Sequence, residues 1–189
     1  MFTVPNLVST ARILLVPLFA YLLFGRDNVT AAGWVLFVIG STDWIDGYLA
    51  RRLNQVSEFG KALDPIADRL AVGVAVLGGW AENIVPDVLA ALIVARELIV
   101  SVGAGLLAWM KVKRIDVRRA GKRATAALYA AVTWFFFAEG YSLDWLGILA
   151  WVVAGIGLAL AYGVLPAYFA DAKRLRSRTA PVEQDSDQV

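Results

Sequence analysis

The sequence predicts an all-α membrane protein with six transmembrane helices and both termini in the cytoplasm. Of its 189 residues, 59% are hydrophobic, whereas a soluble domain is usually about 45–50% apolar. The mean hydropathy is +0.64. A hydropathy window of about 19 residues finds six apolar stretches separated by short polar loops. The basic loops alternate with acidic ones along the chain, as they do in proteins that cross a membrane repeatedly.

The six predicted spans cover residues 7–24, 31–50, 62–79, 86–110, 124–137 and 145–169. The N-terminal segment lacks the charged start and cleavage site of a signal peptide, so we expect the first span to remain in the protein. Residues 173–189 are polar and are predicted to form a short disordered cytoplasmic tail. We therefore expect one transmembrane domain over residues 1–172, followed by this tail.

The loops set the predicted orientation. Basic residues gather at 51–52, at 111–123 and at 173–178, all on one side of the predicted membrane. The opposite loops, at 25–30, 81–87 and 139–144, carry one arginine and five acids. Because cytoplasmic loops carry an excess of Lys and Arg, the pattern indicates a multi-pass protein of the plasma membrane whose basic loops face the cytoplasm.

The residue types exclude several kinds of chemistry. The chain has no cysteine and no histidine, so disulfides, thiolate nucleophiles, imidazole bases and Cys/His zinc sites are all ruled out. Any metal or acid–base chemistry must use carboxylates. The net charge is only +2, with basic residues beside apolar segments. This favours lipid headgroups or phosphorylated substrates as partners, and not nucleic acid.

Two pairs of aspartates lie at the predicted cytoplasmic edge of the membrane. Asp43 and Asp46 are three residues apart near the end of the second span, and Asp64 and Asp68 are four apart at the start of the third. Each pair shares a helix face, and the short loop predicts that the two helices are antiparallel neighbours. Four carboxylates close together need cations, and all-oxygen ligands suit Mg²⁺ or Mn²⁺. They suffice for a site with two metal ions.

Two other interpretations of the aspartates are open. They could be solvated charges at helix ends, paired with Arg51 and Arg52, although small residues between the pairs favour a ligand site. They could also line the path of a divalent-cation transporter. A transport path needs polar groups through the full depth of the membrane, whereas these acids gather at one end.

The aspartates belong to a longer pattern, D-x2-D-G-x2-A-R-x8-G-x3-D-x3-D, which runs from Asp43 to Asp68. This pattern resembles, without a departure, the signature of the CDP-alcohol phosphotransferase family. The resemblance implies a dimeric, helical membrane enzyme. Such an enzyme transfers a substituted phosphoryl group from a CDP-alcohol to a second alcohol and releases CMP.

The resemblance also implies roles for individual residues. The four aspartates would bind the metal ions, and Asp68 would in addition act as the general base for the acceptor hydroxyl. Residues that would contact the CDP-alcohol are Gly47, Ala50, Arg51 and Ser57.

The N-terminal stretch "TVPNLVSTARILLVPLF" resembles the start of the phosphatidylglycerophosphate synthase branch and of the related actinobacterial-type cardiolipin synthases. In that pattern Asn6, Ser9 and Arg12 lie near the lipid pyrophosphate; we assign Asn6 and Ser9 to the CDP-alcohol site and Arg12 to the acceptor side. The alternatives are helix capping for Asn6 and Ser9 and snorkelling to headgroups for Arg12.

Charged residues inside a span are rare and usually functional, and the fourth span contains Arg96 and Glu97. Adjacent residues point in different directions on a helix, so we expect separate partners for them. The Arg-Glu pair and Lys122 resemble features of phosphatidylglycerophosphate synthases, so Arg96 and Lys122 are candidates for binding an anionic acceptor. The alternatives are a salt bridge between helices for Arg96, and anchoring by positive charge for Lys122 and Arg123.

The predicted function is transfer of a phosphatidyl group from CDP-diacylglycerol to an alcohol acceptor, with glycerol 3-phosphate as the first choice. Phosphatidylglycerol, which would give cardiolipin, is the second choice, and inositol phosphate the third. Mg²⁺ or Mn²⁺ is the expected cofactor, and membrane lipids and a second copy of the chain are the expected partners.

Overall fold

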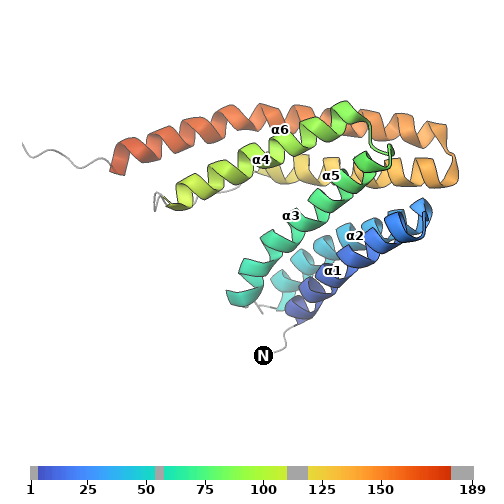
Figure 1. Ribbon diagram of the computed structural model, residues 1–189. Helices are drawn as coiled ribbons and strands as arrows, with labels where there is room; N and C mark the ends of the chain where they lie inside the picture. Colours follow the sequence, from blue (N-terminus) through green and yellow to red (C-terminus); the bar gives the residue numbers. More distant parts are fainter. Residues whose placement is uncertain (1–3, 54–57, 110–118, 180–189) are drawn as a thin grey trace, which may run out of the picture.

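The computed structural model describes the backbone of residues 4–53, 58–109 and 119–179 (Figure 1). It describes side chains mainly over residues 11–42, 70–103 and 123–164. Within the described backbone the protein is helical and contains no strand, which confirms the predicted all-α class. The elements in order are α1 (Val4–Ala20), the π-helical turn η1 (Tyr21–Gly25), α2 (Val29–Leu53), α3 (Glu58–Ala81), α4 (Asp87–Trp109), α5 (Arg119–Tyr141) and α6 (Asp144–Thr179).

The helices run alternately up and down, and every predicted span coincides with one of them (Figure 1). Tight turns join α1 to α2, α3 to α4 and α5 to α6 at one end of the bundle, which we call the turn end. At the opposite end α2, α4 and α6 finish and α1, α3 and α5 begin; we call this the motif end. From the turn end, α1, α2 and α3 diverge from α4, α5 and α6.

The helices differ in whether they are long and apolar enough to cross a membrane. Among the described residues, one stretch, Asp144–Val164 in α6, has both the length and the composition to cross a membrane. Shorter apolar stretches lie at Ala11–Gly25, Val29–Thr42 and Leu70–Ala81. The motif-end turns of α2, α3 and α5 contain charged residues, and those turns hold residues that the sequence singled out.

Helix α6 extends further than the sequence predicted. It continues to Thr179, into the segment that we expected to be disordered from residue 173, so that expectation is wrong as far as Thr179. The segment "ADAKRLRSR" is rich in Ala, Leu, Lys and Arg, which are good helix formers. Basic residues also stabilise the last turns of a helix by interacting with its dipole.

Each of the three turns contains a polar residue in the left-handed backbone conformation. These residues are Asp27, Asn83 and Ser142, with φ of 49°, 57° and 53°. Asp and Asn tolerate this conformation better than most residues, because their short side chains bond to nearby backbone. Backbone hydrogen bonds complete the turns, for example from the Leu143 amide to the Ala138 carbonyl at 2.8 Å.

Helix α5 is the central helix of the bundle. It packs against α2, α3 and α6, and the buried side chains along it include Ala124, Leu128, Val132 and Phe136. Before Tyr141, at its end, none of its described large apolar side chains is exposed. The other helices each expose a row of large apolar side chains, so α5 lies inside the bundle and they surround it.

Small residues set how closely the helices approach. Gly157 of α6 packs on Leu128 of α5, where an added Cβ would lie 3.0 Å from the leucine side chain. The stripe of Gly155, Ala159 and Gly163, which also has helical spacing, is instead exposed. A Cβ on Gly155 or Gly163 would meet nothing within 4 Å. Packing between α5 and α6 therefore uses a different face of α6.

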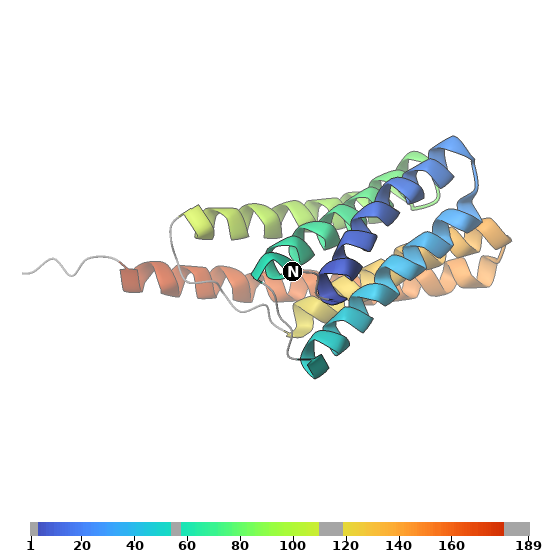
Figure 2. The same ribbon diagram turned by 90° about the horizontal axis from the view of Figure 1, so that it is seen from below.

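Helix α1 lies between the two helices that carry the aspartate pattern (Figure 2). It packs against both α2 and α3. Helices α2 and α3 are antiparallel, as the short loop between them predicted, but they contact each other little. The expectation of direct neighbours is therefore only partly met, because α1 packs against the faces that they would otherwise share.

Candidate functional site

The aspartate pattern lies on two helices at the motif end. Asp43 and Asp46 are in the second half of α2, and Asp64 and Asp68 are in the first half of α3. The backbone is α-helical across both pairs, so spacings of three and four residues place each pair on one face of its helix. Both stretches lie toward the same end of the bundle (Figures 1 and 2). Their side chains lie outside the described residues.

The remaining residues of the predicted CDP-alcohol site are placed by their backbone only. Gly47, Ala50 and Arg51 follow Asp46 on α2, and Ser57 lies outside the described residues. Asn6 and Ser9 are in α1, which already includes Val4. Neither therefore occupies the N-cap position, and the capping alternative is not supported.

Arg12 is the largest fully buried side chain of the described part of the protein. It is 1% exposed, so the alternative that it snorkels to lipid headgroups is wrong. It lies on α1, between the two helices of the aspartate pattern (Figure 2). A buried guanidinium is costly unless negative charge is near it, and this position puts it on the helix beside both aspartate pairs.

Arg96 is also buried, and it joins α4 to α5. The residue is 8% exposed, and its Nη2 donates a hydrogen bond of 3.1 Å to Oγ1 of Thr125. The Thr125 hydroxyl in turn donates to the Gly121 carbonyl at 3.1 Å, so the threonine is held in the orientation that accepts from arginine. Its Nε is buried without a hydrogen-bond partner among the described residues.

The Arg96 guanidinium also forms an ion pair with Glu97 through Nη1 and Oε1. Our expectation that the two residues have separate partners is therefore wrong. Their Cβ atoms do point in different directions, but the arginine side chain is long enough to bring its guanidinium back to the next residue. The alternative of a salt bridge between helices is not seen among the described residues, since Arg96 reaches α5 through a neutral threonine. Thr125 was not among the site residues that the sequence predicted, and its one signal is its position three residues after Lys122.

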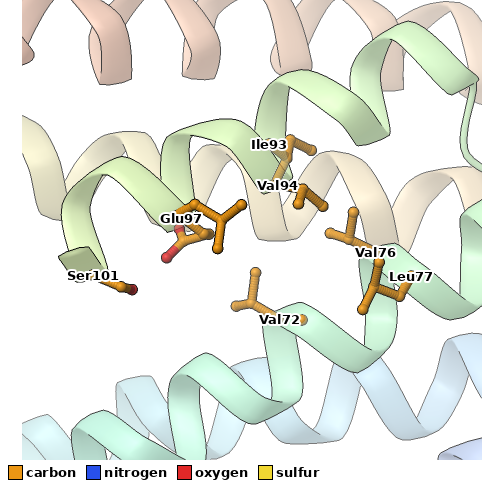
Figure 3. A pocket seen from close by; sticks show the side chains of 9 residues that line it. Val72, Val76, Leu77, Ile93, Val94, Glu97 and Ser101 are labelled. Carbon is orange, nitrogen blue, oxygen red and sulfur yellow. The ribbon is translucent and has the colours of Figure 1, made fainter.

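A cavity of about 180 Å³ lies between α3 and α4. Its walls are mostly aliphatic, and its polar lining residues are Glu97 and Ser101. Figure 3 shows the Glu97 carboxylate and the Ser101 hydroxyl on α4, on the side of the cavity away from Val76 and Leu77. A small apolar cavity with a carboxylate on its wall can hold a small molecule that has both carbon and hydroxyl groups.

The donor set fits hard divalent cations. Four carboxylates on two helices, in a chain without Cys or His, are the oxygen ligands that Mg²⁺ and Mn²⁺ prefer. Among the residues that the structure describes, no group of three or more acidic residues could hold a metal ion, and the four aspartate side chains lie outside that part. The aspartate pattern is therefore the candidate metal centre that the sequence offers.

These features define an all-helical protein with apolar outer faces, an acidic pattern at one end and two buried arginines. A sequence model of the CDP-alcohol phosphatidyltransferase family matches residues 2–162. A CMP-forming cardiolipin synthase of Streptomyces coelicolor is 35% identical over 182 residues, which cover 92% of this chain and 84% of that protein. A CDP-diacylglycerol–glycerol-3-phosphate 3-phosphatidyltransferase of Escherichia coli K12 is 32% identical over 167 residues, covering 82% and 88%.

The chain belongs to the CDP-alcohol phosphatidyltransferase family, and it is an enzyme of that family. The resemblance carried by the aspartate pattern is confirmed. A transferase has no need of a cation path through the membrane, so the transporter alternative loses its support.

Proposed function

We propose that the protein transfers a phosphatidyl group from CDP-diacylglycerol to glycerol 3-phosphate, giving phosphatidylglycerophosphate and CMP. The observation that carries the acceptor assignment is the hydrogen bond between Arg96 and Thr125. It brings a buried arginine of α4 to the first turns of α5, where Lys122 lies three residues before Thr125 on the same helix face. We infer that these two basic residues, which are far apart in sequence, bind one phosphate.

In the proposed reaction, the acceptor hydroxyl attacks the β-phosphorus of CDP-diacylglycerol, and the bond from that phosphorus to the oxygen of CMP breaks. Asp68 takes the proton from the attacking hydroxyl. Divalent ions held by Asp43, Asp46, Asp64 and Asp68 would neutralise charge on the diphosphate and on the departing CMP. Arg96 and Lys122 orient the acceptor by its phosphate, since a guanidinium matches phosphate geometry.

The remaining assignments complete the site. Gly47, Ala50, Arg51 and Ser57, with Asn6 and Ser9 of α1, contact the CDP-alcohol, and the narrow Gly and Ala positions leave room for it beside the helix. Arg12 supplies a buried positive charge between the two acidic helices, on the side where the acceptor and the lipid diphosphate meet.

We propose that Mg²⁺ or Mn²⁺, as a pair of ions, is required for this reaction. Purified protein incubated with CDP-diacylglycerol and glycerol 3-phosphate should release CMP only when one of these cations is present. Excess EDTA should abolish release, and added Mg²⁺ should restore it. Full CMP release in excess EDTA would contradict the metal assignment.

We propose that all six helices cross the plasma membrane, with both termini and the active site on the cytoplasmic side. The exposed apolar side chains support this placement, because soluble monomers rarely expose large apolar patches. Trp80, Tyr141 and Trp145 are exposed near the turn end, where aromatic residues mark a membrane interface. Because the chain lacks cysteine, Ser57→Cys provides a clean probe. Its labelling in intact cells by a membrane-impermeant thiol reagent would contradict this orientation.

A second candidate acceptor is phosphatidylglycerol, which would make the enzyme a cardiolipin synthase. The relative with that name matches 92% of this chain, and the aliphatic cavity beside Glu97 is compatible with a lipid acceptor. The deciding experiment measures CMP release by the purified enzyme with glycerol 3-phosphate, phosphatidylglycerol and inositol phosphate in separate reactions. We expect the highest kcat/KM with glycerol 3-phosphate. A preference for phosphatidylglycerol would replace the first proposal with the second.

A further inference from the structure

Glu97 lines the cavity between α3 and α4, and one of its carboxylate oxygens has no hydrogen bond among the described residues. Its Oε1 accepts from Arg96, whereas its Oε2 has no hydrogen bond to any residue that the structure describes. The side chain is 25% exposed and lines the cavity together with Ser101 (Figure 3). An ionised carboxylate can only accept hydrogen bonds, so this oxygen selects for a ligand that carries a hydroxyl or another donor.

The cavity continues the helix face that carries the proposed base. Val72 lines the cavity and follows Asp68 by four residues on α3, which places the two positions on one face, about 6 Å apart along the helix axis. A molecule that extends from the cavity along this face reaches the position of Asp68. The cavity therefore lies where part of an acceptor would sit while its reacting hydroxyl meets the base.

We propose that Glu97 is a specificity-determining residue that accepts a hydrogen bond from the secondary hydroxyl of the acceptor's glycerol group. This inference rests on the proposed function. In a phosphoglycerol acceptor, a primary hydroxyl attacks the donor, and the neighbouring secondary hydroxyl takes no part in bond making. Glu97 Oε2 accepts from that second hydroxyl, while the CH groups of the glycerol contact the aliphatic walls formed by Val72 and Val94.

The size and composition of the cavity agree with such a ligand. Pockets for drug-sized ligands are about 300–1,000 Å³, so a cavity of about 180 Å³ suits a small group. The ion pair also lets one residue serve two purposes. Glu97 orients the Arg96 guanidinium, and Arg96 binds the acceptor's phosphate in the proposed reaction. Glu97 also accepts a hydrogen bond from the hydroxyl of the same acceptor. The phosphate and the hydroxyl are therefore recognised together.

The test compares two acceptors on two enzymes. One acceptor is glycerol 3-phosphate and the other is 3-hydroxypropyl phosphate, which lacks only the secondary hydroxyl. A hydrogen bond to a charged group contributes about 1.5–3 kcal/mol, so we expect the wild-type enzyme to prefer glycerol 3-phosphate by about 10- to 100-fold in kcat/KM. In Glu97→Ala the preference should fall to about threefold or less.

A purely structural role for Glu97 gives a different result. If Glu97 only holds Arg96, then Glu97→Ala lowers kcat/KM for both acceptors equally and the preference stays as in the wild type. That outcome, or a wild-type enzyme without any preference, would overturn the inference. Glu97→Gln keeps an oxygen for Arg96 and so protects the fold. Its preference should lie between those of the wild type and Glu97→Ala, and an unchanged preference would again count against the proposal.

The glycerol could belong to a lipid headgroup instead of a free phosphate, and a second pair of acceptors separates the two sources. Phosphatidylglycerol and its analogue with a 1,3-propanediol headgroup differ by the same secondary hydroxyl. In the acceptor pair that the wild-type enzyme uses, the acceptor with the secondary hydroxyl should have the higher kcat/KM. In Glu97→Ala this difference in kcat/KM should disappear. If the wild-type enzyme releases CMP with neither natural acceptor, the proposed function itself has failed. A working enzyme with an unchanged preference refutes only the role of Glu97.

Gly73 allows the cavity to be filled without disturbing the packing. It lines the cavity, and an added Cβ would meet nothing within 4 Å. Gly73→Leu should therefore raise the acceptor KM at least about tenfold while the donor KM stays unchanged. The matched control is Gly155→Leu on α6, an exposed position with equally open space, which should leave both KM values unchanged. A rise in the donor KM alone would mean that the cavity holds an acyl chain of the donor, and would overturn the proposal.

Discussion

The turn end and the motif end of the bundle are held together by different kinds of contact. At the turn end, side chains and backbone are closely packed. An added Cβ on Gly140 would lie 2.5 Å from Thr30 Oγ1 and 2.9 Å from Thr30 Cα, and one on Gly79 would lie 2.6 Å from a methyl group of Val85. The Phe19 and Phe136 rings meet edge to face at a centroid distance of 5.5 Å.

Toward the motif end, the described contacts include a polar link between α4 and α5, and the packing between α3 and α4 leaves space. Arg96 is held by Glu97 and Thr125, the cavity opens between α3 and α4, and a Cβ on Gly73 would meet nothing within 4 Å. The difference indicates that the two ends of the bundle have different roles. Close packing at the turn end fixes the angles between helices, and the motif end can then carry charge and space for substrates without contributing most of the stability.

The largest expected effect comes from the motif end. Asp68→Asn keeps the shape of the side chain but removes a proton acceptor and one negative charge from the metal centre. We expect kcat for CMP release to fall by about 10²–10⁴-fold from the loss of base catalysis, while thermal unfolding of the purified protein in detergent stays unchanged. A kcat within about threefold of the wild type, outside the usual range for a lost base, would assign the base to another residue.

The next effect tests the two proposed phosphate ligands. Arg96→Ala and Lys122→Ala each remove a charge that binds only the acceptor, so each should raise the acceptor KM by about 10- to 100-fold. The KM for CDP-diacylglycerol should stay nearly unchanged. If both variants fold and keep the wild-type acceptor KM, the anionic acceptor binds elsewhere.

The third effect belongs to the turn end. Gly140→Ala places a methyl group against the backbone of Thr30, which cannot move aside without separating α2 from α5. We expect a loss of about 1–3 kcal/mol in the free energy of unfolding, measured in detergent, with KM values unchanged for the protein that remains folded. Gly155→Ala is the control, because its Cβ meets open space. Equal stability of the two variants would contradict the close packing of the turn end.

The smallest expected effect comes from a hydrogen bond that lies between the turn end and the motif end. The Tyr129 hydroxyl of α5 donates to the Leu36 carbonyl of α2 at 2.7 Å, and Gly40 leaves room for the Tyr129 ring. Tyr129→Phe should lower stability by about 0.5–1.5 kcal/mol. Leu36 precedes Asp43 by about two turns of α2, so measuring kcat in the same variant shows whether this contact also positions the metal centre. If the two ends have these different roles, kcat should change by less than about twofold, because the hydrogen bond contributes stability and not chemistry.

The helices could be predicted from the sequence because their signals are local. Apolar stretches and polar loops follow one another along the chain, and each predicted span became a helix. The family could also be predicted from the sequence, since the pattern from Asp43 to Asp68 depends only on residue spacing within two helices that are consecutive in the chain. The prediction of disorder at residues 173–179 was wrong because polar residues such as Lys and Arg are also good helix formers.

Contacts between distant residues could not be predicted in this way. Composition alone did not distinguish α5 as the central helix, and small residues with helical spacing do not show which face of α6 packs on α5, where Gly157 makes the contact. The sequence marked Arg12 and Arg96 as unusual but left their surroundings open. The burial of Arg12, the path of Arg96 to Thr125 and the placing of Glu97 on a cavity wall depend on how helices from different parts of the chain meet.

The sequence by itself determined which residue types are available for the proposed chemistry: carboxylates for metal and proton, basic residues for phosphate, and no cysteine or histidine. It also determined the order of the helices, because helical hydrogen bonds and the apolar stretches that predict helices extend over a few turns of chain. The tertiary structure decided which helix lies between α2 and α3, which charges are buried and where space remains. Those features arise from packing between helices, where side-chain volume and the reach of an arginine matter more than any local pattern.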